Sequence, residues 1–254
     1  MKTADFLILL PAYNEENSLS SVINQLGNLF SLDQLILADD GSTDNTSIIA
    51  KEIGIRIIRN RRNRGKGSIL RSSFITIIKK FPTFKWVVTI DSDGQHDCQD
   101  IVRFLKTISL NPEVDIIVGK RDYSQMPPVN WISNKLTSRW SNYWLNWNLT
   151  DLQCGFRCYN TTALRKILNF GLKKNKFDLE TEILLVAWLL DLKIVEIPIK
   201  TLYPRNRRKS RIRPVFDTMR WILLVFQYAF TLKFVNKVWQ NRFLLNLRKK
   251  RVKN

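Results

Sequence analysis

Two aspartates, Asp91 and Asp93, lie two residues apart directly after the apolar run 86–90. Such a run predicts a buried strand, and in open α/β sheets ligands bind beyond the carboxyl ends of the strands. Hard cations such as Mg2+ take oxygen ligands and usually divide their coordination between one or two carboxylates and the phosphates of a substrate. The pair therefore suits a divalent cation that also holds a phosphorylated ligand, although aspartates at this spacing are also common in turns.

Polar clusters follow the other predicted strands as well. Apolar runs at 6–10, 35–38, 55–58, 86–90 and 114–118 alternate with stretches that predict helices, which indicates βαβ units and a mostly parallel sheet. A parallel sheet brings the carboxyl ends of its strands to one rim, so we expect the clusters that follow them to lie together. Those clusters are Tyr13/Glu15, Asp39/Asp40, Asn63/Lys66, Asp91/Asp93 and Lys120/Arg121. Each one taken alone could equally consist of turn and cap residues.

The alternation of strands and helices breaks after Arg121. Residues 131–148 predict a helix with Trp140, Trp144 and Trp147 on one face, which suits core packing or membrane contact better than base stacking. Further elements are predicted as helices at 161–169 and 179–190 and as a strand at 193–199, placed at an edge or ended by Pro198.

Charge is concentrated at one end of the 254-residue chain, whose formal net charge is +19. Residues 1–199 hold 25 Lys and Arg against 21 Asp and Glu, whereas residues 200–254 hold 16 against Asp217 alone. This asymmetry predicts an anionic partner for the tail, either a membrane surface or nucleic acid. No RNA-binding signature or zinc module accompanies it, so we expect no nucleic-acid partner.

The cysteines and the N-terminus favour a reducing compartment. Cys98, Cys154 and Cys158 are an odd, scattered set with no second pair that would complete a zinc site. The chain enters an apolar strand within its first six residues, so no signal peptide is visible. A cytoplasmic location is the simplest interpretation.

Eight short motifs occur in order over residues 6–220. They lie at 11–15, 39–44, 63–67, 91–96, 119–121, 151–157, 177–182 with 196–199, and 210–214. Their order resembles that of the inverting family 2 glycosyltransferases of the GT-A fold, and among them the dolichol- or polyprenyl-phosphate mannosyl- and glucosyltransferases. The resemblance implies a Rossmann-like catalytic domain over 1–203, followed by a basic acceptor loop and a membrane-interfacial helical tail over 204–254.

The resemblance also implies roles for individual residues. Those expected to bind the nucleotide sugar are Pro11, Ala12, Tyr13, Glu15, Ala38, Asp39, Asp40, Lys66, Asp91, Ser92 and Asp93. Those expected to hold Mg2+ or Mn2+ are Asp91, Asp93 and Gln95. Catalytic roles fall to Asp93, Arg121 and Asp151, and acceptor binding to Gln153, Arg157, Lys209, Ser210 and Arg211.

The residue types fit these roles on chemical grounds. The ring of Tyr13 can lie against a base, and Glu15 and Asp40 can accept hydrogen bonds from base and ribose. A cation on Asp91 and Asp93 would neutralise a departing diphosphate as a Lewis acid, and Arg121 can add a charge-assisted contact.

The nature of the acceptor decides whether a catalytic base is needed. A lipid phosphate is already anionic near neutral pH, so positioning and charge neutralisation would suffice. A sugar hydroxyl would need a carboxylate base, for which Asp151 is the candidate, although it could also be a helix or turn cap. The one histidine, His96, could be catalytic but is better explained as packing or hydrogen bonding beside the metal loop.

The basic tail contains an uncharged apolar run at 221–232. As a helix its 12 residues would be about 18 Å long, which is too short to cross a bilayer. A helix lying in the interface of an anionic membrane fits better, and a final helix packed on the body is the alternative.

We therefore expect a metal-dependent, inverting enzyme. It would transfer a hexose from a donor of the UDP-glucose or GDP-mannose type to polyprenyl or dolichyl phosphate, as a peripheral protein on the cytoplasmic face of a membrane. Transfer to a hydroxyl of a glycan or glycolipid is the alternative, and a basic nucleic-acid-binding protein is a distant one.

Overall fold

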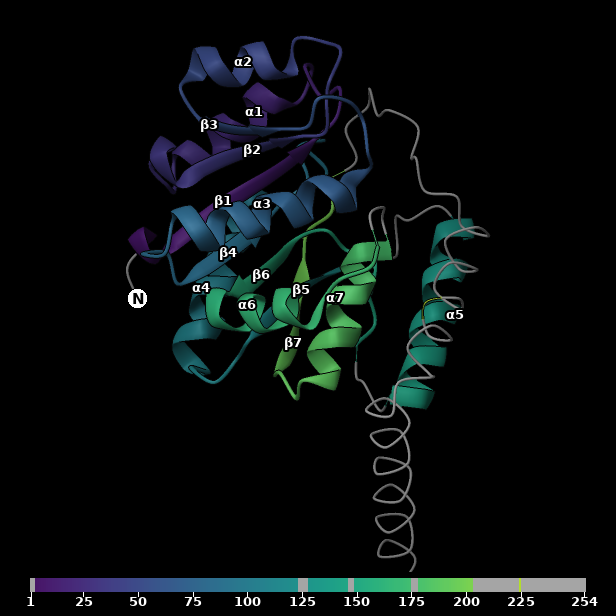
Figure 1. Cartoon of the computed structure of the whole chain (residues 1–254). Coiled ribbons are helices and arrows are strands. Elements are labelled where there is room, and N and C mark those ends of the chain that lie inside the picture. Colours follow the sequence, from purple (N-terminus) through teal and green to yellow (C-terminus); the bar gives the residue numbers. More distant parts are fainter. Residues whose placement is uncertain (1–2, 123–127, 146–148, 175–177, 203–223, 225–254) are drawn as a thin grey trace, which may run out of the picture.

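The computed structural model of the chain describes residues 3–122, 128–145, 149–174, 178–202 and 224. These residues form a seven-stranded sheet in the order β3-β2-β1-β4-β6-β5-β7 (Figure 1). The strands are β1 (Phe6–Ala12), β2 (Leu35–Asp39), β3 (Arg56–Arg59), β4 (Trp86–Thr89), β5 (Ile116–Arg121), β6 (Arg157–Asn160) and β7 (Ile194–Ile199). Of these seven strands only β6 runs antiparallel to its neighbours, so the carboxyl ends of the other six share one rim.

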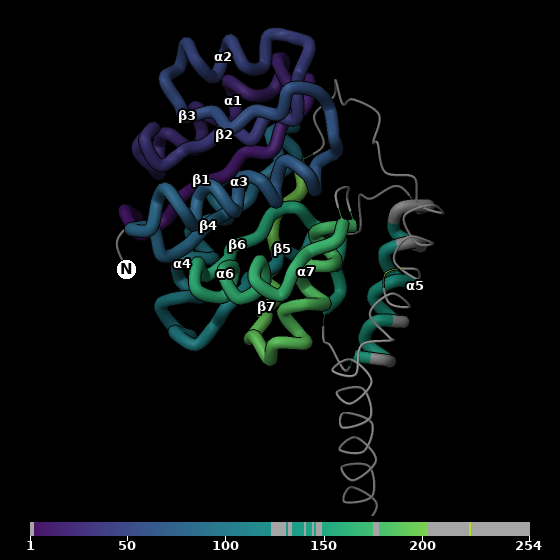
Figure 2. The backbone as a smooth tube through the Cα atoms, viewed as in Figure 1, coloured from purple at the N-terminus to yellow at the C-terminus, as the bar shows by residue number. Residues whose placement is uncertain are grey.

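The α-helices are α1 (Leu19–Gly27), α2 (Thr46–Ile53), α3 (Lys66–Lys80), α4 (Ile101–Leu110), α5 (Pro128–Leu145), α6 (Thr161–Phe170) and α7 (Asp178–Leu189). In Figure 1 α5 lies to one side, apart from the sheet. Helices α3, α6 and α7 pack against one another over one face (Figure 1). In Figure 2 the first half of the chain, purple to blue, and the second half, teal to green, occupy opposite ends of the sheet.

The core lies where the sheet is covered on both faces. Every residue of β1, β2 and β4 is buried, and their apolar side chains alternate between the two helical layers. Burial on both faces explains why these strands appear in the sequence as continuous apolar runs.

The predicted mostly parallel sheet flanked by helices is confirmed. β1 continues through Pro11 to Ala12, beyond the predicted run 6–10. Pro11 is tolerated because β1 pairs with β4 only as far as Leu9, so the missing N–H faces no strand on that side. β7 is an edge strand, as Pro198 predicted.

Strand β6 was not predicted. Its sequence, Arg157–Asn160, contains only two apolar residues, Cys158 and Tyr159, between polar ends. Such a short run gives no periodic signal, yet β6 lies between β4 and β5 near the centre of the sheet. Because β6 is antiparallel, the residues before Arg157 lie at the rim formed by the carboxyl ends of the other six strands, which we call the functional rim.

Two predictions fall outside the described residues. One is the shared face of Trp140, Trp144 and Trp147, whose side chains the structure does not describe. The other is the membrane-interfacial tail over 204–254, of which only Leu224 is described. Within the described part of the chain, no helix combines the length and the apolar character needed to cross a membrane.

Candidate active site

The loops after β1 and β4 are tied together at the functional rim. Ser92 Oγ donates to the Pro11 carbonyl at 3.0 Å, and Ser18 Oγ donates to the Ser92 carbonyl at 2.7 Å. Ser92 is buried, so its side chain serves this link. The polar clusters after these two strands therefore lie next to each other, as the sequence predicted.

Asp39 organises the loop that follows β2. Its buried carboxylate accepts hydrogen bonds from Ser42 N at 2.8 Å and from Ser47 Oγ, and Arg59 Nε lies 3.0 Å away. Gly41 has φ +75°, and a Cβ there would lie 2.6 Å from the main chain of Arg62. The loop therefore needs glycine for its backbone conformation and for its close approach to residue 62.

Asp40 fixes the basic, glycine-containing loop that precedes α3. Its carboxylate accepts from Asn60 Nδ2 at 2.8 Å, Arg64 N at 3.0 Å and Gly65 N at 2.7 Å. Both carboxylates thus hold these loops in place, and the nucleotide-binding roles of Asp39 and Asp40 stay predictions.

Tyr13 and Glu15 lie half-buried on the loop after β1. Asn14 between them adopts the left-handed region at φ 57°, and its N–H donates to Ser42 Oγ at 2.9 Å. Glu15 N donates to Thr46 Oγ1 at 2.8 Å. These bonds hold the β1 loop against the β2 loop, beside the buried Ala38 that pairs with Pro11.

Asp91 forms the centre of a charged cluster. Lys66 Nζ lies 2.6 Å from Asp91 Oδ1 and 3.1 Å from Oε1 of the buried Glu180. Burial alone would raise the pKa of Asp91, but the charge of Lys66 outweighs it and lowers that pKa. Burial likewise opposes charge on Lys66, and the two carboxylates nonetheless raise its pKa. Asp91 and Lys66 are therefore both ionised at neutral pH.

The main chain of Gly155 packs closely against this ion pair. A Cβ at position 155 would lie 2.6 Å from Asp91 Oδ2 and 2.7 Å from Lys66 Nζ. Thr89 Oγ1 donates to the Gly155 carbonyl at 2.9 Å, which fixes the main chain at this distance from the end of β4. A larger residue at this position would therefore displace both side chains from their present positions.

Asp93 and Gln95 follow Asp91 in the same loop and contact each other. Asp93 accepts from Gln95 N at 3.0 Å and from Gln95 Nε2 at 2.7 Å. Among the residues that the structure describes, no group of three His, Cys, Asp or Glu side chains could hold a metal ion. Two carboxylates still fit a Mg2+-type site, because such ions complete their coordination with substrate phosphates and water.

His96 packs beside Asp91. Its Nε2 lies 3.9 Å from Asp91 Oδ2, and its ring contacts the ring of Phe156 at a centroid distance of 5.3 Å. Burial lowers the pKa of His96 to about 4, and the positive charges of Arg121 and Lys66 act in the same direction. At neutral pH the ring is therefore neutral and only weakly basic.

Arg121 and Asp151 form a bidentate ion pair at the end of β5. Arg121 Nε and Nη2 donate to the carboxylate of Asp151 at 2.7 and 2.8 Å, and Asn134 Nδ2 donates to it at 2.9 Å. Burial would raise the pKa of Asp151, but the guanidinium outweighs it and holds that pKa below its ordinary value. Such a carboxylate orients Arg121 and is a poor proton acceptor.

Some residues of the site had no role assigned from the sequence, although Glu180 and Glu196 lie within the motifs at 177–182 and 196–199. Glu196 on β7 accepts from Asp151 N at 2.7 Å and Thr150 N at 2.8 Å, and so positions the loop that carries Asp151. Asn134 was missed, and Glu180 was noted only as part of the motif at 177–182. A further signal for Glu180 was a carboxylate in a helix whose other residues are largely apolar.

The prediction that Arg157 binds the acceptor is revised. Arg157 is fully buried, and its guanidinium donates to the carbonyls of Cys154 at 2.7 Å, Leu152 at 2.8 Å and Glu180. These bonds give Arg157 a structural role, joining the loop before β6 to α7. Gln153 lies partly exposed in the turn after Asp151 and stays a candidate for acceptor binding.

We expect Arg157→Met to lower the free energy of unfolding by at least about 3 kcal/mol, because three buried carbonyls lose their donor. Urea unfolding measures the change, with Arg165→Met on the exposed side of α6 as a control expected to stay within about 0.5 kcal/mol of the parent. A variant of unchanged stability that binds the acceptor poorly would restore the original assignment.

Residues 201 and 202 lie beside the loop 91–96. Thr201 pairs with His96 in a β-bridge, and Leu202 N donates to the Gln95 carbonyl at 2.8 Å. Lys209, Ser210 and Arg211 lie outside the described residues, so their acceptor roles stay predictions.

All three cysteines of the chain are free and buried. Burial raises the pKa of Cys98 to about 11 and that of Cys154 to about 12, and it raises the pKa of Cys158 well above its ordinary value. They therefore act as apolar core residues.

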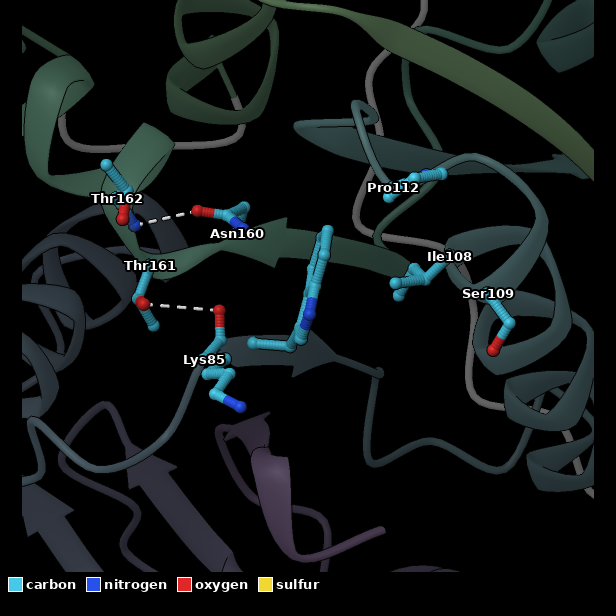
Figure 3. A pocket seen from close by; sticks show the side chains of 8 residues that line it. Lys85, Ile108, Ser109, Pro112, Asn160, Thr161 and Thr162 are labelled. Carbon is cyan, nitrogen blue, oxygen red and sulfur yellow. Dashed lines mark hydrogen bonds between the residues drawn. The ribbon is translucent and has the colours of Figure 1, made fainter. Parts of the chain in front are cut away.

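A pocket lies at the opposite end of β4 from Asp91 (Figure 3). Two of its polar side chains, Asn160 and Thr161, have partners within the fold. Asn160 accepts from Thr162 N at 2.9 Å and so caps α6, and Thr161 Oγ1 donates to the Lys85 carbonyl at 3.1 Å. These bonds stabilise the junction of β6 and α6, and the residues that line the pocket form no grouping for catalysis.

Comparisons with known proteins agree with this geometry. The family model Glycosyl transferase family 2 matches residues 7–168. A UDP-N-acetylglucosamine–dolichyl-phosphate N-acetylglucosaminyltransferase of Methanococcus voltae is 32% identical over 226 residues, covering 79% of this chain and 87% of that protein. An undecaprenyl-phosphate mannosyltransferase of Micrococcus luteus is 23% identical over 231 residues, covering 85% and 93%.

A solved structure supports the fold. Glucosyl-3-phosphoglycerate synthase of Mycobacterium tuberculosis, in complex with Mn2+, UDP and phosphoglyceric acid, superposes with a TM-score of 0.67 at 21% identity, covering 89% of this chain and 78% of that one. The match of the family model to more than half of the chain, together with the GT-A architecture, identifies the chain as a glycosyltransferase that belongs to glycosyl transferase family 2.

Proposed function

We propose that this enzyme transfers a hexose, with inversion, from a nucleoside-diphosphate sugar to polyprenyl or dolichyl phosphate. The observation that carries the proposal is the bidentate pairing of Asp151 with Arg121. The carboxylate expected to act as base for a hydroxyl acceptor has a lowered pKa, and His96 is also weakly basic. An acceptor that is already anionic needs neither group as a base.

The relatives support the same acceptor. The Methanococcus voltae and Micrococcus luteus proteins are named for transfer to dolichyl phosphate and undecaprenyl phosphate, respectively. The donor of this chain would be of the UDP-glucose or GDP-mannose type. Arg121, held by Asp151, would direct its positive charge towards the phosphates, since that charge already acts on Asp91.

A divalent cation fits the loop after β4. Asp91 and Asp93 would hold Mg2+ or Mn2+, with Gln95 as a third ligand, and the ion would supply Lewis-acid stabilisation of the leaving diphosphate. The Mycobacterium tuberculosis neighbour is described with Mn2+ and UDP, which supports a cation of this class. The side chains of Tyr13 and Glu15 would receive the nucleoside on the neighbouring loop.

The experiment that tests the function is a screen of donors against a matched pair of acceptors. The full chain is incubated with UDP-glucose, GDP-mannose and UDP-N-acetylglucosamine, with Mn2+, Mg2+ or EDTA. A short polyprenyl phosphate serves as acceptor and the corresponding polyprenol, which ends in a hydroxyl, as control. We expect metal-dependent product with the phosphate alone. Equal transfer to the polyprenol, or transfer only to glycan hydroxyls, would overturn the proposal.

The basic tail would hold the enzyme on an anionic membrane surface at the cytoplasmic face. We expect deletion of residues 214–254 to release the protein from liposomes that contain anionic lipid, because it removes the apolar run 221–232 and much of the tail's positive charge. Co-sedimentation measures binding, and zwitterionic liposomes are the control for the electrostatic contribution. Sedimentation that the deletion leaves unchanged would contradict the membrane role.

A further inference from the structure

We infer that Lys66 is a resident counter-ion, which occupies the charge position beside Asp91 until a divalent cation arrives together with the donor diphosphate. The inference rests on the proposed function in that it needs a donor of this class. It goes further by assigning Lys66 two successive partners, and it predicts that the cation enters with the donor and binds only weakly alone.

The contacts of Lys66 carry the first step. Its ammonium lies 2.6 Å from Asp91 and 3.1 Å from Glu180. The main chain of Gly155 packs against it so closely that a Cβ at position 155 would lie 2.7 Å from the ammonium nitrogen. Asp91 is one of the two carboxylates that fit the cation. In the structure as described, that carboxylate is therefore already neutralised by a charge of the same sign as the cation.

Charge balance carries the second step. Asp91 and Glu180 contribute two negative charges and Lys66 one positive charge, within a cluster that is largely withdrawn from water. A divalent cation on Asp91 would place like charges a few ångströms apart, and such repulsion is strong where water is excluded. The cation can bind well there only if the ammonium moves away or if new negative charge arrives.

A donor diphosphate would supply that negative charge. Lys66 is the first residue of α3, and the N-terminal end of a helix favours anions through its backbone N–H groups. Its four-carbon stem lets the ammonium turn without movement of the backbone. Glu180 would retain the lysine within the cluster while its contact with Asp91 is exchanged for a phosphate.

A purely structural role makes the opposite prediction. If the Lys66 bridge only joins α3, β4 and α7, its removal should loosen the loop after β4, and Mn2+ should bind more weakly with or without nucleotide. If Lys66 is a resident counter-ion, loss of the lysine should strengthen Mn2+ binding to the nucleotide-free protein and weaken binding of the nucleotide. The direction of the change in Mn2+ affinity without nucleotide therefore separates the two explanations.

The test compares Lys66→Met with Lys85→Met, the exposed lysine at the other end of β4. Isothermal titration measures Mn2+ binding to nucleotide-free protein. We expect Lys66→Met to bind Mn2+ about tenfold more tightly than the parent, because the competing charge is gone. In the presence of Mn2+ we expect the opposite effect on nucleotide affinity: Lys66→Met should bind UDP or GDP about tenfold more weakly than the parent, because the phosphates lose the ammonium. Lys85→Met should match the parent in both titrations.

Further measurements keep the outcome decisive. Lys66→Arg retains the charge and should show the weak nucleotide-free binding of the parent. If Lys66→Met is less stable, its melting temperature should rise more on addition of Mn2+ than that of the parent. Equal or weaker Mn2+ binding by Lys66→Met without nucleotide would overturn the inference. Failure of the parent to transfer sugar in the screen, with the reversal of binding intact, would count against the proposed function alone.

Discussion

Replacing Asp93 by asparagine is expected to reduce the rate of sugar transfer by about 10³-fold, because the proposed cation would lose a charged ligand at the point where negative charge develops on the leaving diphosphate. The amide oxygen of the introduced side chain would still accept from Gln95 N, so the loop 91–96 should keep its shape. Transfer rates at saturating donor, measured over a range of Mn2+ concentrations, test the expectation.

Asp33→Asn is the matched control, since Asp33 lies exposed in the turn before β2, away from the functional rim. It should transfer sugar at the parent rate with the same dependence on Mn2+. An Asp93→Asn variant that remains active in EDTA would rule out the metal-assisted reaction.

The second large effect is expected from a single added methyl group. Gly155→Ala would place a Cβ at 2.6 Å from Asp91 Oδ2 and 2.7 Å from Lys66 Nζ. Both atoms end flexible side chains, so the protein can accommodate the methyl group by moving them at modest cost in stability. Displacement of a reacting arrangement by about 1 Å can cost about 100-fold in rate. We therefore expect transfer to fall about 100-fold while the melting temperature changes little.

Gly27→Ala is the control for this substitution. Gly27 ends α1, and a Cβ there would meet no atom within 4 Å. This variant should keep the parent activity and gain slightly in stability, because alanine reduces the freedom of the unfolded chain. If Gly155→Ala instead loses stability and activity in proportion, the glycine serves the packing of the loop and does not set the geometry of the ion pair.

The sequence predicted the parts of the fold that depend on local pattern. Buried strands such as β1 and β4 appear as continuous apolar runs, and the polar residues after them were expected at one rim. β6 could not be predicted, because its position between β4 and β5 depends on contacts with distant strands rather than on its own two apolar residues.

The ion pairs of the site could not be predicted from the sequence for the same reason. Lys66 and Glu180 are 114 positions apart, and only the packing of α3 against α7 brings them together. The sequence left Asp151 as either a base or a cap, and its ion pair with Arg121, 30 residues away, gives it a different role. Arg157 was misassigned because a motif identifies the residue type and not the direction of the side chain.

The burial of every native cysteine has a practical consequence for spectroscopy. A thiol reacts as its thiolate, and the raised pKa values of Cys98 and Cys154 leave almost none of that form at neutral pH. A cysteine introduced at an exposed site such as Leu110, which is 70% exposed at the end of α4, would therefore be the preferred target of a maleimide dye or nitroxide. Labels could thus be placed at chosen positions on the otherwise native enzyme without removal of any of its own cysteines.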